Sequence, residues 1–214
     1  MNHFLNALQR LDTNVFILFN ERIHNPVFDE VMPFLTNLAH HWYFWVGVVI
    51  IWVAMILFGG KRGRAFSTLI PFVMAVSDQT SSHLIKHLVN RPRPCWLING
   101  HPLVPHERLL QGRLGSPSFP SSHSTNMMAL ATLLIILYPK KWWLWLLIPL
   151  LIGYTRVYVG VHFPGDVLAG YAVGFGSACF VVWVSTLLGL KWSDPKTEKA
   201  AERVENLPSD TERA

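Results

Sequence analysis

The stretch WYFWVGVVIIWVAMILF, from Trp42 to Phe58, decides the fold class of this chain. It contains no charged residue, and apolar side chains occupy almost every position. A helix needs about 20 such residues to cross the hydrocarbon core of a bilayer. The length and uniform apolarity of this run are typical of a membrane helix.

Four other segments extend this pattern. Trp142 to Val161 and Val167 to Leu190 are long and apolar, and Met127 to Tyr138 becomes long enough if its helix begins near Ser121. Ala65 to Val89 carries polar residues that face the interior of a bundle if the segment spans. We therefore predict an all-α integral membrane bundle with five transmembrane helices.

The composition of the whole chain supports this class. The 214 residues are 51% hydrophobic and only 14% charged, against about 25% charged residues in soluble domains, and the mean hydropathy is +0.30. The net charge of +5 is small and no basic block is present, which argues against nucleic-acid binding. Met1 to Arg22 lacks the pattern of a cleavable signal peptide.

The two ends of the chain differ from the apolar segments. Asn25-Pro26 separates a short mixed segment, Asn14 to Ile23, from Val27 to Leu38, and we predict an N-terminal interfacial helix here. A sixth span is the alternative, but it places Asp29 and Glu30 in lipid. The charged segment Ser193 to Ala214 has no apolar periodicity and is predicted to be a disordered cytoplasmic tail. The membrane-embedded domain then covers residues 1–192.

Basic residues in the short loops predict the orientation. With five spans they fall on one side, which the positive-inside rule makes cytoplasmic; they are Lys61, Arg62, Arg64, Lys140, Lys141 and Lys191. The other loops, including the long loop 90–120, then face outward.

Charged and titratable residues gather in three short motifs of this apolar chain. They are Lys86 with Arg93-Pro94, Pro120-Ser121-Ser122-His123, and Thr155-Arg156 with His162 and Asp166. Three cations, two histidines and one carboxylate are what phosphoryl transfer through a histidine nucleophile requires. All three motifs lie at the outward ends of predicted helices.

Each residue type has a physical reason to be in such a site, and each has a structural alternative. A phosphate ester carries about −1.5 to −2 charges, which Lys86, Arg93 and Arg156 can neutralise, although an arginine near a helix end more often reaches toward the interface. Ser121 and Ser122 begin a helix whose free amides bind anions. The alternative for these serines is N-capping.

In order and spacing, the three motifs resemble those of the type 2 phosphatidic acid phosphatase superfamily. Ser122 stands where that family usually has glycine, and Thr155 where it has serine. The resemblance implies metal-independent hydrolysis in which His162 is the nucleophile and forms a phosphohistidine. It also implies that Asp166 orients His162 and that His123 protonates the leaving group and then activates water.

Two further features bear on the predicted site: a polar stripe that leads to Lys86, and a possible set of metal ligands. Asp78, Ser82 and Lys86 recur every four residues and form a polar stripe on one helix. His123, His162 and Asp166 are conceivable metal ligands, but three neighbouring cations would repel a divalent ion. We expect no metal and no cofactor.

The resemblance predicts an enzyme of the bacterial cytoplasmic (inner) membrane, and the loop charges predict that its active site faces the periplasm. Its partners are the bilayer and a lipid phosphate substrate. Family members in bacteria act on undecaprenyl diphosphate, phosphatidylglycerophosphate, lipid A phosphates or phosphatidic acid, and the short chain with an outward site favours undecaprenyl diphosphate. The alternatives are a lipid phosphotransferase, a non-catalytic lipid-binding or transport protein, and a vanadate-dependent peroxidase, whose known members are soluble. The sequence leaves the oligomeric state open.

Overall fold

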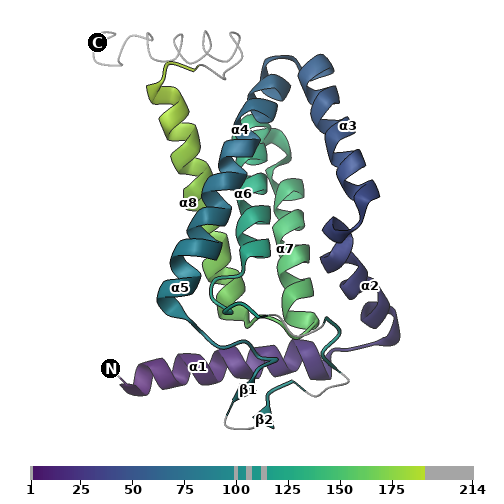
Figure 1. The fold of residues 1–214 in the computed structure, drawn as a ribbon, viewed down its shortest axis with the longest axis vertical. Helices are drawn as coiled ribbons and strands as arrows, with labels where there is room; N and C mark the ends of the chain where they lie inside the picture. Colours follow the sequence, from purple (N-terminus) through teal and green to yellow (C-terminus); the bar gives the residue numbers. More distant parts are fainter. Residues whose placement is uncertain (1, 99–100, 105–107, 112–114, 191–214) are drawn as a thin grey trace, which may run out of the picture.

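The computed structural model of the chain describes residues 2–98, 101–104, 108–111 and 115–190. The predicted tail, Ser193 to Ala214, the end of the predicted domain and Lys191 lie outside these residues. The described chain is almost entirely helical (Figure 1). The only sheet in this described part is an antiparallel pair of two-residue strands, β1 (Leu97–Ile98) and β2 (His101–Pro102).

Four long helical segments pack as a bundle, and a fifth stands beside α4 at its edge (Figure 1). These segments are α3 (Trp42–Phe58), α4 (Gly60–Asp78) with its continuation through η3 (Gln79–Ile85) and α5 (Lys86–Val89), α6 (Ser122–Leu137), α7 (Trp142–Tyr158) and α8 (Pro164–Leu187). The apolar core lies between α4, α6 and α8.

Small residues let α6 and α8 approach closely. Gly170 and Gly174 are one turn apart on α8, and a Cβ atom at Gly170 would lie 2.7 Å from the backbone oxygen of Ser121. At Gly174 a Cβ atom would meet the backbone of Thr125. Membrane helices associate through such small residues because there is little hydrophobic driving force between helices in lipid. This contact fixes the start of α6 against α8, where two of the motifs lie.

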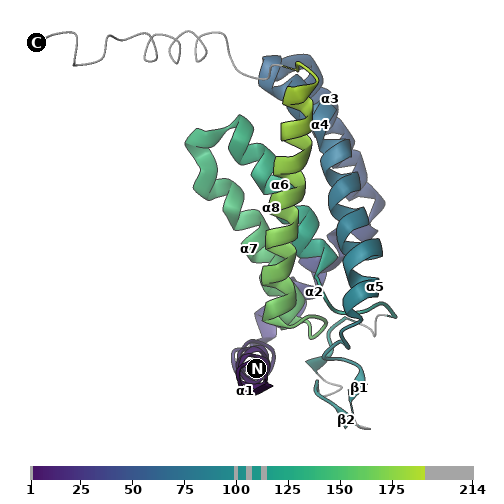
Figure 2. The ribbon, with the colours of Figure 1, turned by 90° about the vertical axis from the view of Figure 1, so that its left-hand side faces the viewer.

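The N-terminal region forms two helices that differ in direction. Asn25 accepts a hydrogen bond from the amide of Phe28 and caps α2 (Pro26–Asn37), so the predicted break at Asn25-Pro26 is present. The helix α1 (Asn2–Ile17) begins before the segment identified in the sequence and continues into η1 (Leu18–Arg22). It lies across one end of the bundle and is seen end-on in Figure 2.

The number of membrane spans stays a prediction. In the described part of the chain, α8 alone is by itself long and apolar enough to cross a membrane. The segment Pro26–His40 with α3 qualifies as a pair bent by 65°. The helices α6 and α7 have 16 and 17 residues, fewer than the usual 20 or so, and the α4 segment contains many polar residues.

Candidate active site

The three motifs meet at one end of the bundle, next to α1 (Figure 1). Lys86 lies near the end of the α4 segment, Ser122 and His123 begin α6, Arg156 lies in the last turn of α7, and His162 precedes α8. These residues and Arg93 line one cavity of about 1260 Å³. Asp166 and Ser121 do not line the cavity; they lie behind it and are fully buried.

His162 lies in the short connection between α7 and α8, with its side chain buried. Its Nε2 atom is 3.0 Å from Nη1 of Arg93. Because a guanidinium group can only donate, Nε2 is the acceptor, and the ring proton of a neutral His162 is therefore on Nδ1. Nδ1 is 3.6 Å from Oδ2 of Asp166. That distance is too long for a hydrogen bond, so Asp166 acts on the ring mainly through its charge.

Burial lowers the pKa of the His162 imidazole to about 3. The Asp166 carboxylate opposes this shift, while the charges of Arg93 and Arg156 reinforce it. His162 is consequently neutral at pH 7, with an unprotonated Nε2 on the side of the cavity. An unprotonated imidazole nitrogen is the form that can act as a nucleophile.

Asp166 is held by several donors at the start of α8. Its Oδ2 accepts hydrogen bonds from the hydroxyl of Ser118 and, at 2.8 Å, from the backbone amide of Phe163. Its Oδ1 accepts a bond of 2.7 Å from Arg91. The bond from the Phe163 amide is the half of a capping box in which the N3 side chain accepts from the N-cap backbone, so Asp166 also caps the start of α8.

Arg93 and Arg156 are both buried and are fixed by polar groups outside the three motifs. Nε of Arg93 donates to the backbone oxygen of Ser116 at 2.6 Å, and its Nη2 donates to the Ser116 hydroxyl at 3.0 Å. Nη1 of Arg156 donates to the hydroxyl of Thr36 at 2.5 Å and to Oε1 of Gln111 at 2.8 Å. These bonds hold two guanidinium groups at the same cavity, where they create a strongly cationic end.

The two serines of the second motif have different environments. The Ser121 hydroxyl caps α6 by accepting from the Ser124 amide and hydroxyl, at 3.5 and 3.0 Å. The backbone amide of Ser121 donates to the backbone oxygen of Asp166 at 3.0 Å. Ser122 lines the cavity and shares a 2.8 Å hydrogen bond with Ser82. Capping thus accounts for the Ser121 hydroxyl, whereas Ser122 is placed where a phosphate could bind.

The polar stripe predicted on the segment Ala65 to Val89 faces this cavity. Asp78, Ser82 and Lys86 all line it, and the Ser82 hydroxyl donates to Oδ1 of Asp78 at 3.0 Å. Asn126 of α6 donates to the same carboxylate at 3.5 Å. The helix is of π type between Asp78 and Lys86, a distortion that occurs often at functional sites.

The rest of the cavity is apolar and extends along the bundle. On α4 its walls include Met74, Ile70 and Phe66, and it ends beside Arg62, Lys140 and Lys141. The α4 positions from Arg62 to Asp78 correspond to about 24 Å of helix at 1.5 Å per residue. The cationic site and the long apolar channel are therefore two parts of one continuous cavity.

Among the described residues, no group of three His, Cys, Asp or Glu side chains is arranged to hold a metal ion. His123 and His162 are accompanied by Lys86, Arg93 and Arg156 at the cavity. Their positive charge suits a phosphate group better than a divalent cation. Independence from metal stays a prediction.

Several residues at the site were not predicted from the sequence. Arg91, Ser116 and Ser118 lie in the loops beside the motifs, and Thr36 and Gln111 are far from Arg156 along the chain. Arg91 was visible as a basic residue next to the first motif. The serines, Thr36 and Gln111 are residue types that are common in any loop or cap.

Comparisons with known proteins identify the relatives of this chain. The model of the PAP2 superfamily matches residues 67–189. The chain is 33% identical to a lipid A 4'-phosphatase of Bacteroides thetaiotaomicron, over 81% of this chain and 76% of that protein. It is 31% identical to the undecaprenyl-diphosphatase BcrC of Bacillus subtilis, over 70% and 71% of the two chains.

A solved structure has the same fold. The crystal structure of a transmembrane PAP2 type phosphatidylglycerolphosphate phosphatase from Bacillus subtilis superimposes with a TM-score of 0.62 and 27% identity, over 85% of this chain and 87% of that one. This likeness identifies the chain as an integral membrane protein of the same helical fold. Because the family match covers more than half of the chain and the relatives align over most of their length, the chain belongs to the PAP2 superfamily and is a phosphatase, as the three motifs predicted.

Proposed function

We propose that the protein is a lipid phosphatase that hydrolyses a phosphomonoester or diphosphate of a membrane lipid through a phosphohistidine on His162. One observation carries this proposal: Nε2 of a neutral, buried His162 lies at the cationic end of a long apolar cavity. A lipid phosphate has these two parts, an anionic head and an apolar chain, in the same arrangement. The relatives, which act on lipid A and undecaprenyl diphosphate, support the class.

In the first step the Nε2 lone pair attacks phosphorus, and the bond from phosphorus to the leaving oxygen breaks. Lys86, Arg93 and Arg156 stabilise the charge that develops on the phosphoryl oxygens. Arg93 moves its hydrogen bond from Nε2 to a phosphoryl oxygen. Asp166 stabilises the ring, whose proton on Nδ1 faces the carboxylate, as the imidazole acquires positive charge.

His123 handles the proton of the reaction. It lines the same cavity on the first turn of α6. In our proposal it takes up a proton when the anionic head group binds, because the negative charge favours the imidazolium, and then donates that proton to the leaving oxygen of the lipid. In the second step His123 accepts a proton from water, the water oxygen attacks phosphorus, and the bond between phosphorus and Nε2 breaks. Inorganic phosphate leaves, and both histidines return to their starting states.

Undecaprenyl diphosphate is the substrate that we favour among membrane lipids. Between its acidic end at Asp78 and its basic end at Arg62 the cavity follows α4 for about 24 Å, which is more than half of the roughly 30 Å hydrocarbon thickness of a bilayer, and so it can hold a chain longer than one leaflet. Phosphatidylglycerophosphate and lipid A phosphates are the alternatives. We further propose five spans with α2 and α1 near the outer interface, the motif end facing the periplasm, and a disordered cytoplasmic tail.

The experiment is a phosphate-release assay on purified protein in detergent with a chelator present. The substrates are undecaprenyl diphosphate, phosphatidylglycerophosphate and lipid A, and the variants are His162→Ala and, as a matched control, His87→Ala, which removes an exposed histidine of α5. We expect release that survives chelation, is highest with undecaprenyl diphosphate, persists in His87→Ala and is lost in His162→Ala.

Two results contradict parts of this proposal. A requirement for a divalent metal, or activity that remains in His162→Ala, overturns the phosphohistidine mechanism. Transfer of the phosphoryl group to an added acceptor lipid in place of water identifies a phosphotransferase instead.

A further inference from the structure

Arg91 links the catalytic carboxylate to the N-terminal helix. Its Nη1 donates to Oδ1 of Asp166 at 2.7 Å and its Nη2 donates to Oδ2 of Asp12 at 2.7 Å. The guanidinium also lies 4.2 Å from the ring centroid of Phe163. One planar group thus joins two carboxylates that are far apart in the sequence, and its stacking on Phe163 fixes its plane.

Asp12 has a second contact that fixes α1 to the start of α8. Its other oxygen, Oδ1, accepts a hydrogen bond of 2.7 Å from the backbone amide of Gly165. One turn further along α1, Phe16 is buried and packs against Phe163, with ring centroids 5.4 Å apart. The face of α1 that carries Asp12 and Phe16 is therefore held against the residues that flank His162 and Asp166.

We propose that Arg91 and Asp12 are positioning residues for the phosphatase reaction, and that α1 is for this reason part of the active site. Neither side chain lines the cavity, so neither contacts substrate. Arg91 occupies Oδ1 of Asp166 and leaves Oδ2 facing Nδ1 of His162. Asp12 in turn fixes the position of Arg91. The inference rests on the proposed roles of His162 and Asp166.

The physical reason is the burial of Asp166, which is completely shielded from solvent. A buried carboxylate depends on charged and hydrogen-bonding partners to stay ionised and in one orientation. Without Arg91, one of its oxygens loses a charged donor and the carboxylate can rotate. The positive charge that develops on His162 during phosphoryl transfer is then less well stabilised.

The test compares the variants Arg91→Gln, Arg91→Lys, Asp12→Ala and Asp166→Asn in the full-length protein over a range of lipid phosphate concentrations that reaches saturation. We expect Arg91→Gln to lower kcat by roughly 10-fold to 100-fold while KM changes less than about twofold, because the substrate contacts are intact. Asp12→Ala lowers kcat by a smaller factor, and Arg91→Lys recovers part of the activity because it keeps the charge.

A double-mutant comparison separates positioning from a general loss of structure. In the Asp166→Asn background the target of Arg91 is already uncharged, so adding Arg91→Gln is expected to cost much less than it does alone. If the reductions in kcat of the two single variants multiply in the double variant, the inference is overturned. An unchanged kcat in Arg91→Gln overturns it as well. Loss of activity in His162→Ala together with normal activity in Arg91→Gln would leave the proposed function standing and remove only this inference.

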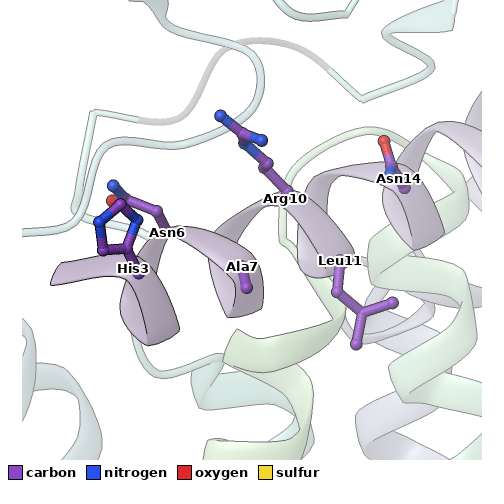
Figure 3. Close-up of a pocket in the computed structure, with 6 residues that line it drawn as sticks. All are labelled: His3, Asn6, Ala7, Arg10, Leu11 and Asn14. Atoms are coloured by element: carbon purple, nitrogen blue, oxygen red, sulfur yellow. The ribbon is translucent and has the colours of Figure 1, made fainter. Parts of the chain in front are cut away.

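Arg10→Gln provides the matched control on the same helix. Arg10 is exposed and lies two residues from Asp12, which is roughly 200° around an α-helix. Figure 3 shows it with His3, Asn6 and Asn14 at a shallow pocket of about 370 Å³ on α1. We expect wild-type kcat for Arg10→Gln; a loss equal to that of Arg91→Gln would show that any arginine near α1 matters and would overturn the inference.

Discussion

Nη1 of Arg93 lies 3.0 Å from Nε2 of His162 and also donates to the backbone oxygen of Val161 at 3.0 Å. This relationship keeps the nitrogen that faces the cavity unprotonated while it holds a cation at the place where a phosphoryl oxygen would bind. In the proposed mechanism, the same contact keeps His162 able to act as the nucleophile and places the cation that stabilises the phosphoryl oxygens.

The protonation state of His162 can be measured directly. Because burial lowers its pKa to about 3, below the ordinary value of about 6.5, the ring is expected to stay neutral from pH 7 down to at least pH 5. Nitrogen NMR of histidine-labelled protein, with the signal assigned by its loss in His162→Gln, should show an unprotonated Nε2 across this range. Titration near pH 6.5 would contradict the expectation.

The same shift has a consequence for acid stability. Between about pH 6.5 and pH 3 the unfolded chain binds a proton at His162 that the folded chain does not bind. Lowering the pH through this window therefore favours unfolding at this position.

Gln111 is expected to matter through Arg156. In Gln111→Leu the buried guanidinium loses the Oε1 acceptor at 2.8 Å. An unsatisfied buried donor costs about 1–3 kcal/mol, so the guanidinium is expected to leave its position at the cavity, and this misplacement should lower kcat/KM by roughly 10-fold. Gln111→Glu keeps an acceptor for Arg156 and is the matched control, with a smaller expected loss. Equal losses in the two variants would argue that the contact of Gln111 with Asn37, and not with Arg156, is the important one.

The close approach of α6 and α8 predicts different effects at two glycines of α8. A Cβ atom at Gly170 would lie 2.7 Å from the Ser121 oxygen, whereas one at Gly176 would have no atom within 4 Å. Gly170→Ala should destabilise the protein by about 1–3 kcal/mol and displace the start of α6. Gly176→Ala should be neutral or slightly stabilising, since alanine is the better helix former.

Thermal unfolding in detergent, followed by circular dichroism, measures both variants. Similar melting temperatures for Gly170→Ala and Gly176→Ala would mean that α6 and α8 can move apart without a measurable loss of stability.

The length of the cavity predicts how activity depends on the lipid chain. Ile70 lies about midway along the α4 wall, between Arg62 and Asp78. Ile70→Trp should obstruct the channel and raise KM for undecaprenyl diphosphate by roughly 10-fold or more. KM for the shorter farnesyl diphosphate should change little.

Leu168→Trp is the control for this prediction, because it adds the same side chain to the exposed face of α8. An equal effect of Ile70→Trp on both lipids would show that the chain does not follow this channel.

The sequence by itself determined one apolar helix, the polar stripe and the protein family. Trp42 to Phe58 forms a helix with those bounds, and the polar stripe of Asp78, Ser82 and Lys86 faces the cavity as its spacing predicted. These features are readable because they depend on residues a few positions apart, whose geometry the helix repeat fixes. The order and spacing of the three motifs identified the PAP2 superfamily before any contact was known, and the family match confirms it.

Only the tertiary structure decided what supports that chemistry. Arg91 meets Asp12 and Asp166 across 79 and 75 positions of the chain, and Arg156 meets Thr36 across 120. No local periodicity encodes such contacts, since they depend on how α1, α2 and the loops pack against the bundle. The apolar cavity depends in the same way on the distance between α3 and the other helices. The local sequence thus supplied the groups that we propose to react, and long-range packing supplied their orientation and the apolar cavity beside them.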